Sequence, residues 1–306
     1  MQGIGDLATQ MLLFVRTVQE GSFSAAARTL DLSPSAVSKQ ISRLEDRLGV
    51  RLLNRTTRHI SLTDEGRAFY ERALRVVAEI GETEEWIAAH QGTVRGVLRV
   101  AATVPFAKYH VLPLLPEFLE RYPELEVSAE LSDRHVDLVE EGVDVGIRFT
   151  EQLSDPSLVA RKLAVNRRVI CAAPSYLERH GIPQSPEDLL HHNCLRLYTV
   201  STFNDWELDG PDGTRVVRVK GNFETNSADA LFHAALTGLG IARLSTFIVG
   251  PALKAGTLVQ VLPEYVHERA SILAVYPHRR HLSPKVRAFI DFLLEKFTPV
   301  PPWERE

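Results

Sequence analysis

The chain has 306 residues, of which 44% are hydrophobic and 24% are charged, so it is long enough for two or three ordinary folded domains. No apolar run approaches the roughly 20 residues of a membrane span, and the N-terminus lacks the basic and apolar stretches of a signal peptide. The sequence therefore argues against membrane-spanning and exported proteins, and it predicts a protein of the cytoplasm.

The distribution of charge is more informative than its total. The whole chain carries −4, which by itself argues against a nucleic-acid partner. Residues 1–60, however, contain eight Lys or Arg and five Asp or Glu, so this segment carries +3 and the rest carries −7. A basic head on an acidic body is typical of a DNA-binding regulator.

Three short helices are predicted in this head. Their apolar residues recur at the spacing of one helical face in 11–18, in 23–30 and in 37–48. Only Asp31-Leu32-Ser33 separates the second helix from the third, and so short a link forces two helices to cross steeply. The pattern predicts a helix-turn-helix.

The third helix has the chemistry of a DNA-reading helix. Ser33 followed by Pro34 is a strong helix start, and the first residues of a recognition helix are those that reach base edges. Hydroxyl and ammonium groups can contact bases, and a row of cations can follow the phosphates. The candidate DNA contacts are Pro34, Ser35, Ser38, Lys39 and Arg43. The alternative is a solvated helix face on which Glu45 and Asp46 neutralise the cations.

A short, basic, β-prone stretch follows in residues 50–62, with a plausible turn at Thr56-Thr57. We interpret it as the wing of a winged helix-turn-helix, in which Arg55 and Arg58 could touch phosphate or the minor groove.

The head resembles the LysR-type transcriptional regulators. The resemblance is carried by four ordered motifs: Ser22-Phe-x-Ala-Ala-Ala-Arg-x-Leu30, Leu32-Ser-Pro-Ser-Ala-Val-Ser-Lys-Gln-Ile41, Leu44-Glu-x-x-Leu-Gly-Val-Arg-Leu-Leu-x-Arg55 and Leu62-Thr-x-x-Gly66. It implies that Pro34, Ser35, Ser38, Lys39 and Arg55 contact double-stranded promoter DNA. Lys39 stands where many members have Arg, so it lacks the bidentate fork.

A long helix is predicted next, capped by Thr63 and running to about His90. Six positions alternate spacings of four and three, and five of them are apolar, which indicates a coiled-coil seam. They are Phe69, Ala73, Val76, Ile80, Thr83 and Ile87. The alternative is a helix packed on its own domain. The family resemblance implies a homodimer or homotetramer through this helix.

Strands and helices alternate after Gln91-Gly92-Thr93, which predicts a mostly parallel α/β body. One helix is expected from about Pro105 to Arg121. The resemblance implies a two-lobed α/β effector domain of periplasmic-binding-protein type. The predicted domains are 1–62 (winged helix-turn-helix), 63–91 (linker helix) and 92–306 (effector domain), with lobe one at 93–164 and 269–297 and lobe two at 165–268.

Ligands of such folds lie at the carboxyl ends of strands and at helix N-termini. There, hydroxyl, amide and guanidinium groups can hold the carboxylate of a small-molecule effector, which indicates an organic acid. The candidate effector contacts are Thr103, Val104, Pro105, Arg148, Phe149, Tyr198, Asn226, Ser227 and Arg243. The alternative for each is a helix cap or a surface ion pair.

Other functions have little support in the sequence. No motif of a hydrolase, nucleotide-binding loop or paired-cysteine site appears, so neither an enzyme nor a cofactor is expected. A metal site at His191-His192-x-Cys194 lacks a second ligand pair at zinc spacing. Cys171 and Cys194 are interpreted as inert thiols, although a redox pair stays open. RNA polymerase would be a partner if the protein is an activator.

Overall fold

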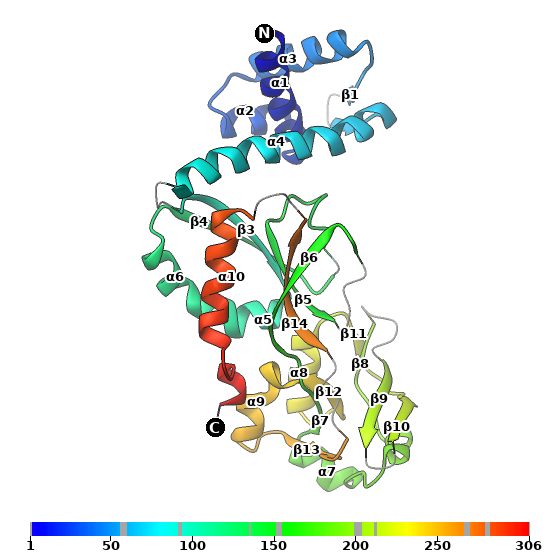
Figure 1. Ribbon diagram of the computed structural model, residues 1–306. Helices are drawn as coiled ribbons and strands as arrows, with labels where there is room; N and C mark the ends of the chain where they lie inside the picture. Colours follow the sequence, from blue (N-terminus) through cyan, green and yellow to red (C-terminus); the bar gives the residue numbers. More distant parts are fainter. Residues whose placement is uncertain are drawn as a thin grey trace. The chain divides into compact units, whose positions relative to one another are not determined.

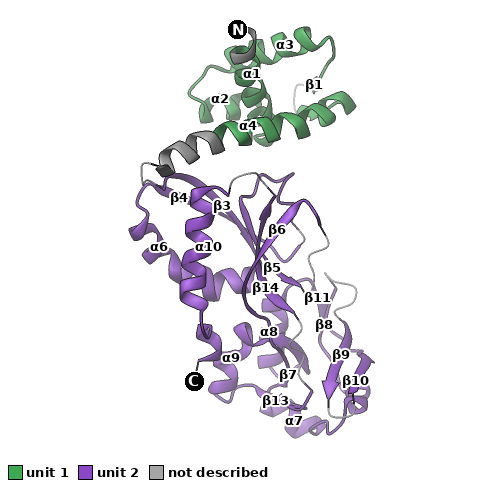
Figure 2. Ribbon diagram, in the orientation of Figure 1, with its two compact units in different colours: residues 1–92 green, residues 93–306 purple. Residues whose placement is uncertain are grey.

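The computed structural model describes residues 2–55, 60–90, 94–134, 136–150, 155–198, 204–210, 213–265, 270–278 and 282–305. The chain forms two compact units, Met1–Gly92 and Thr93–Glu306, which are coloured separately in Figure 2. Within these described ranges, no helix combines the length and the hydrophobicity that crossing a membrane would require.

The first unit is a small helical domain with a β-hairpin, and it confirms the predicted helix-turn-helix (Figure 1). Its core is formed by buried apolar residues of the three helices, among them Phe14, Val37, Ile41 and Leu44. The Oγ of Ser22 accepts a hydrogen bond from the Ala25 N–H (3.1 Å) and thereby caps the second helix. The elements are α1 (Gln2–Gln19), α2 (Phe23–Thr29), α3 (Pro34–Leu48), β1 (Leu53–Arg55), β2 (Ile60–Leu62) and α4 (Asp64–His90).

The long helix α4 begins as part of this head. Ala73 is fully buried in the head's core, and Phe69 packs against that core, where its ring lies 5.5 Å from that of Phe14. The first two positions of the predicted seam are therefore used within the head. Val76 and Ile80 are 39% and 44% exposed, as seam residues of a single chain would be. The side chains of Thr83 and Ile87 lie outside the described part of the chain.

The second unit contains two lobes, each built on its own sheet. Lobe one has the five-stranded sheet β4-β3-β5-β14-β6, in which β3 runs parallel to β4 and β5, and β14 runs antiparallel to β5 and β6. Its elements are β3 (Gly96–Ala102), α5 (Val104–Phe106), η1 (Ala107–Val111), η2 (Leu112–Leu114), α6 (Leu115–Arg121), β4 (Leu125–Leu131), β5 (Val145–Thr150), β6 (Leu158–Val165), β14 (Ser271–Pro277) and α10 (Pro284–Phe297).

Lobe two has the sheet β12-β7-β13, and a parallel bridge between Cys194 and Ile241 joins the pair β8-β11 to it. Its elements are β7 (Arg168–Ala172), α7 (Pro174–His180), η3 (Pro186–His191), β8 (Arg196–Leu197), β9 (Asp205–Gly210), β10 (Gly213–Arg218), β11 (Glu224–Thr225), α8 (Ala228–Leu236), β12 (Ala242–Ser245), α9 (Thr246–Lys254) and β13 (Val259–Val261).

The expectation of mostly parallel strands is wrong for lobe two, because β7 is antiparallel to both β12 and β13. The chain enters lobe two along β7 and returns to lobe one along β14, which is also antiparallel to its neighbours. These two strands arrive from the other lobe instead of through a local helical crossover, so the rule that makes βαβ strands parallel does not govern them.

The predicted helix 105–121 is broken into four short pieces: α5, a π-helical turn η1, a 3-10 turn η2, and α6. Pro113 and Pro116 lie at the joints, and proline removes a backbone donor from the helical ladder. The helical pitch therefore changes along the segment.

An ion pair attaches α10 to the sheet of lobe one. The side chain of Lys285, which is 7% exposed, lies with Nζ 3.2 Å from the Oδ2 of Asp144 and donates to the carbonyl of Val97 (2.8 Å). The same carboxylate oxygen accepts the N–H of Arg99 at 2.9 Å. This buried charge is therefore matched by both an opposite charge and hydrogen bonds.

Candidate functional site

The start of α3 presents a row of polar side chains to solvent. The Oγ of Ser33 accepts from the Ala36 N–H (3.2 Å) and lies 3.1 Å from the Oγ of Ser35. Pro34, Ser35, Lys39 and Arg43 are exposed, and Ser38 is half-buried. We call Pro34, Ser35, Ser38, Lys39 and Arg43 the reading edge. Lys39 and Arg43 make no ion pair with another residue in the described ranges, so their charges are available to a polyanion.

Glu45 connects α3 to the chain that follows it. Its Oε1 accepts the backbone N–H groups of Leu52 (2.9 Å) and Leu53 (3.1 Å), which lie at the start of the wing. The carboxylate therefore ties α3 to the hairpin. No pattern in the sequence marks this contact, because an acidic residue among arginines looks like a surface ion-pair partner.

The wing is the antiparallel pair β1–β2, with Leu53 opposite Leu62. Arg55 is the last residue of β1, but its side chain and the whole of residues 56–59, which include Thr56, Thr57 and Arg58, lie outside the described residues. Thr63 closes the wing: its Oγ1 donates to the Arg51 carbonyl (2.7 Å) and accepts the Gly66 N–H (2.9 Å), which caps α4 as predicted.

The candidate effector residues of lobe one lie at the ends of β3 and β5, which are neighbouring parallel strands. The Oγ1 of Thr103 is buried and has no hydrogen-bond partner within the described ranges. Val104 donates its N–H to the Oδ1 of Asp133 (3.2 Å), and Pro105 is buried. Arg148 donates to the Val136 carbonyl at 2.8 Å, and burial lowers the pKa of its guanidinium. Buried polar groups normally have a hydrogen-bond partner, so this hydroxyl is the lobe-one candidate that best indicates a missing polar ligand.

The side chain of Phe149 packs against other aromatic rings. Its ring stacks on Phe247 of lobe two at 5.1 Å and meets Phe106 edge-on at 5.4 Å. It belongs to an aromatic cluster that contains residues of both lobes. Phe149 therefore lies where the two lobes meet.

The candidate residues of lobe two surround the start of α8, which contacts α5 of lobe one. The Oγ of Ser227 accepts the Ala230 N–H (3.4 Å), so this hydroxyl caps α8. Asn226 is exposed, and Tyr198 is 57% exposed with its N–H bonded to the Thr225 carbonyl (3.0 Å).

The structure does not bring Arg243 to this place. Its guanidinium lies 5.8 Å from the ring centroid of Trp206 and donates to the Glu207 carbonyl (3.3 Å). Alternation along β12 explains the position, because Ala242 and Leu244 face the helices α8 and α9 while Arg243 faces the other side of the sheet. Burial, with Arg168 nearby, lowers the pKa of Arg243 to about 9.

His110 was not anticipated from the sequence. It lies in the π-helical turn of lobe one, and its Nε2 donates to the Phe247 carbonyl of lobe two at 2.8 Å. Beside it, Lys108 Nζ lies 3.5 Å from the Oδ2 of Asp229, and the Tyr109 hydroxyl donates to Oδ1 (3.3 Å). Three consecutive residues of this turn therefore contact lobe two. Single π-helical turns are frequent at functional sites, and the prolines that flank this one, Pro105 before it and Pro113 after it, are the local sign of irregularity in the sequence.

Burial lowers the pKa of His110 below its ordinary value of 6.5, while the bond to Phe247 opposes the shift. The unfolded chain therefore takes up a proton at a higher pH than the folded one, and stability falls as pH decreases through about 6.5 toward the lower folded pKa. We expect the melting temperature to fall between pH 7.5 and 5.5, and the fall to be smaller in His110→Gln. An equal fall in both proteins would contradict this assignment.

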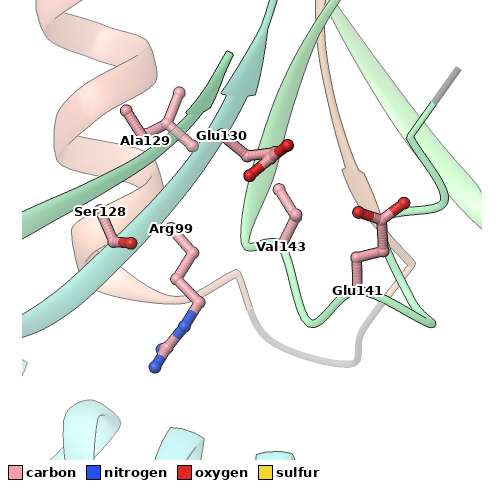
Figure 3. A pocket seen from close by; sticks show the side chains of 7 residues that line it. Arg99, Ser128, Ala129, Glu130, Glu141 and Val143 are labelled. Carbon is pink, nitrogen blue, oxygen red and sulfur yellow. The ribbon is translucent and has the colours of Figure 1, made fainter. Parts of the chain in front are cut away.

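A pocket lies on lobe one away from these residues (Figure 3). It is lined by Arg99, Val100, Ser128, Ala129, Glu130, Glu141 and Val143. Arg134 already pairs with Glu141 at 2.7 Å and lies 3.8 Å from Glu130. No predicted effector residue lines this pocket.

The cysteines and histidines form no reactive cluster in the described part of the chain. Cys171 and Cys194 are buried free thiols, and desolvation raises the pKa of each to about 12, which disfavours the reactive thiolate. Among the described residues, no group of three His, Cys, Asp or Glu side chains has a metal-binding arrangement.

Comparison with known proteins covers both units. Residues 8–67 match the model of the bacterial regulatory helix-turn-helix proteins of the lysR family, and residues 91–298 match the LysR substrate binding domain. The chain is 38% identical over 288 residues to the HTH-type transcriptional activator TtdR of Escherichia coli K12, which covers 94% of this chain and 92% of TtdR.

Two solved full-length regulators have a similar fold. CrgA, a LysR-type regulator from Neisseria meningitidis, matches with a TM-score of 0.62 and 35% identity over 95% of this chain and 98% of CrgA. AphB, a virulence activator from Vibrio cholerae, matches with a TM-score of 0.62 and 30% identity over 94% and 98% of the two chains. With a winged helix-turn-helix head and a two-lobed effector domain both matched, the chain belongs to the LysR family of transcriptional regulators.

Proposed function

We propose that this regulator binds a palindromic promoter site through two copies of its reading edge and that a small organic acid, held between its lobes, controls the outcome. The observation that supports the DNA contact is the exposed start of α3, where Lys39 and Arg43 have no ion-pair partner in the described ranges. Helix starts of this kind read base edges in the major groove, and phosphate contacts fix the register.

Replacing Lys39 or Ser38 by Ala should weaken specific binding more than non-specific binding. A well-placed base contact contributes about 1–3 kcal/mol of discrimination, so the ratio of the two affinities should fall roughly 5- to 150-fold at fixed salt. Titration of operator and scrambled duplexes measures the ratio. Arg72→Ala, on the exposed part of α4, is the matched control and should leave it unchanged. An unaltered ratio in both Lys39→Ala and Ser38→Ala would show that the reading edge does not determine which DNA sequence is bound.

The effector proposal is supported by the buried Oγ1 of Thr103, which has no hydrogen-bond partner among the described residues and lies directly before α5, a helix that contacts α8. A carboxylate at this place accepts hydrogen bonds from the Thr103 hydroxyl and from the side-chain amide of Asn226, and Arg148 supplies a positive charge. The residues around it are Val104, Pro105, Phe149, Tyr198 and Ser227. Arg243 is not part of this set, because its side chain lies on the other face of β12.

Thermal-shift screening of organic acids on the full chain tests this site, because a ligand that binds only the folded state raises the melting temperature. We expect an active acid to lose most of its shift in Thr103→Val, which keeps the shape but removes the hydroxyl. Thr237→Val, in lobe two after α8, should respond like the parent chain. Equal shifts in Thr103→Val and the parent chain would place the acid elsewhere.

Members of the LysR family act as oligomers, and we propose a homodimer or homotetramer joined through the exposed Val76 and Ile80 of α4. Because TtdR is a transcriptional activator, we further propose that this chain activates transcription by contacting RNA polymerase. Its place of action would then be the cytoplasm.

A further inference from the structure

The chain after α10 crosses from lobe one to lobe two. α10 ends at Phe297, and a 3-10 turn, η5 (Pro302–Glu304), then packs against α9. The match to the LysR substrate binding domain ends at residue 298, so residues 299–305 lie beyond the matched domain. We call residues 299–305 the tail segment.

The tail segment places an indole ring in the aromatic cluster between the lobes. The Trp303 ring centroid lies 4.4 Å from that of His110 and 5.9 Å from that of Phe106 in lobe one, and 6.2 Å from that of Phe247 in lobe two. Trp303 is only 7% exposed. Its carbonyl oxygen lies so close to Gly250 of α9 that a Cβ there would be 3.2 Å away. The indole therefore fills a slot to which both lobes contribute.

The next residue places a carboxylate at the start of α9. The Oε1 of Glu304 accepts a hydrogen bond from the hydroxyl of Thr246, the first residue of that helix, and its Oε2 lies 3.7 Å from Arg167. The N-terminus of a helix carries partial positive charge and favours an anion. At the other end of α9, Lys254 donates to the Arg305 carbonyl. The ring and the carboxylate thus occupy adjacent apolar and anion-binding positions.

We propose that the tail segment is a tethered ligand, and that the site it fills is a binding site for an aromatic carboxylate. This site shares no residue with the set proposed around Thr103, and it adjoins that set at Phe149, whose ring contacts Phe106 and Phe247. It contains the slot of His110, Phe106 and Phe247 together with the anion contacts of Thr246 and Arg167. While the tail segment is docked, it holds lobe one against α9. A competing aromatic acid replaces the ring and the carboxylate but not the covalent connection to α10, so the lobes become free to change their separation.

The test uses full-length Trp303→Ala/Glu304→Ala and the probe indole-3-propionate, which carries both chemical groups that the variant lacks. The variant should melt roughly 6–20 °C below the parent chain, as expected for a lost core tryptophan in a domain of this size. Millimolar indole-3-propionate should recover part of that loss while leaving the parent chain unchanged. The uncharged analogue 3-indolepropanol should recover less, because the anion contacts stay unused.

Phe118→Ala is the matched control, because this core aromatic of lobe one packs on Phe289 and Phe292 and does not touch Trp303. It should lose stability without recovery by either probe. A second arm adds a peptide of residues 299–306 to a chain that ends at Thr298, and the peptide should raise its melting temperature. If the shortened chain does not fold, the double variant decides. If the double variant is destabilised and neither probe stabilises it, Trp303 only fills the core and the proposal is overturned. A double variant that melts at the same temperature as the parent chain would overturn it as well.

Discussion

Gly66→Ala should unfold the DNA-binding head or displace its wing, with loss of operator binding. A Cβ on Gly66 would lie 2.0 Å from the Leu52 carbonyl oxygen and 2.8 Å from its carbon, both of which are backbone atoms that no rotamer change can move. That carbonyl also accepts the Thr63 N–H (3.0 Å), so displacing it breaks the connection between the wing and α4. Overpacking of this kind costs about 1–3 kcal/mol, and we expect the upper end.

Gly81→Ala is the matched control in the same helix, because nothing lies within 4 Å of a Cβ built there. Alanine is about 1 kcal/mol more favourable than glycine inside a helix, so this variant should be as stable as the parent or more so. Circular dichroism on heating and a gel-shift titration compare the two. Similar behaviour of Gly66→Ala and Gly81→Ala would mean that the wing tolerates the added methyl group.

Lys285→Ala should cost about 3–5 kcal/mol, the range measured when one partner of a buried ion pair is removed. The substitution leaves the carboxylate of Asp144, 15% exposed, without the ammonium group 3.2 Å away, and it also removes the donor to Val97. Because this pair attaches α10 to β3 and β5, the loss should appear in the unfolding of the effector domain while the head keeps its own transition.

Lys296→Ala gives the comparison on the same helix. Lys296 pairs with Glu117, whose side chain is 48% exposed, and surface pairs contribute about 0–1 kcal/mol. Calorimetry should therefore separate the two lysine variants by several degrees in the effector-domain transition. Equal losses would show that the charge of Lys285 is as well solvated as that of Lys296.

The head was predictable because its signals are local. Ser22, Ser33 and Thr63 each cap a helix within three residues of their own position, and the apolar spacing of α1–α3 is uninterrupted. The role of Glu45 was not predictable in this way. Its partners are the backbone N–H groups of Leu52 and Leu53, seven and eight residues away, and no side-chain pattern marks them.

The effector domain was predictable in outline but not in its contacts. Thr103 and Ser227 follow strand ends and lie near the α5–α8 contact, as expected. Arg243 also lies near the end of a strand, but alternation along β12 turns its side chain toward Trp206. The contact between Thr246 and Glu304 joins residues 58 positions apart, and that of His110 with Phe247 spans 137. Such pairs depend on how the two lobes fold together, which a single sequence does not encode in any local pattern.

The packing of Phe69 and Ala73 into the head makes the first turns of α4 rigidly continuous with the reading edge. At 1.5 Å per residue, the 27 residues of α4 form a rod roughly 40 Å long. A tilt of such a rod by only about 5° displaces one end relative to the other by roughly 3.5 Å, close to the spacing of about 3.4 Å between successive base pairs. If the reading edge contacts DNA as proposed, a small tilt of α4 is therefore enough to displace it by a distance comparable to one base-pair step.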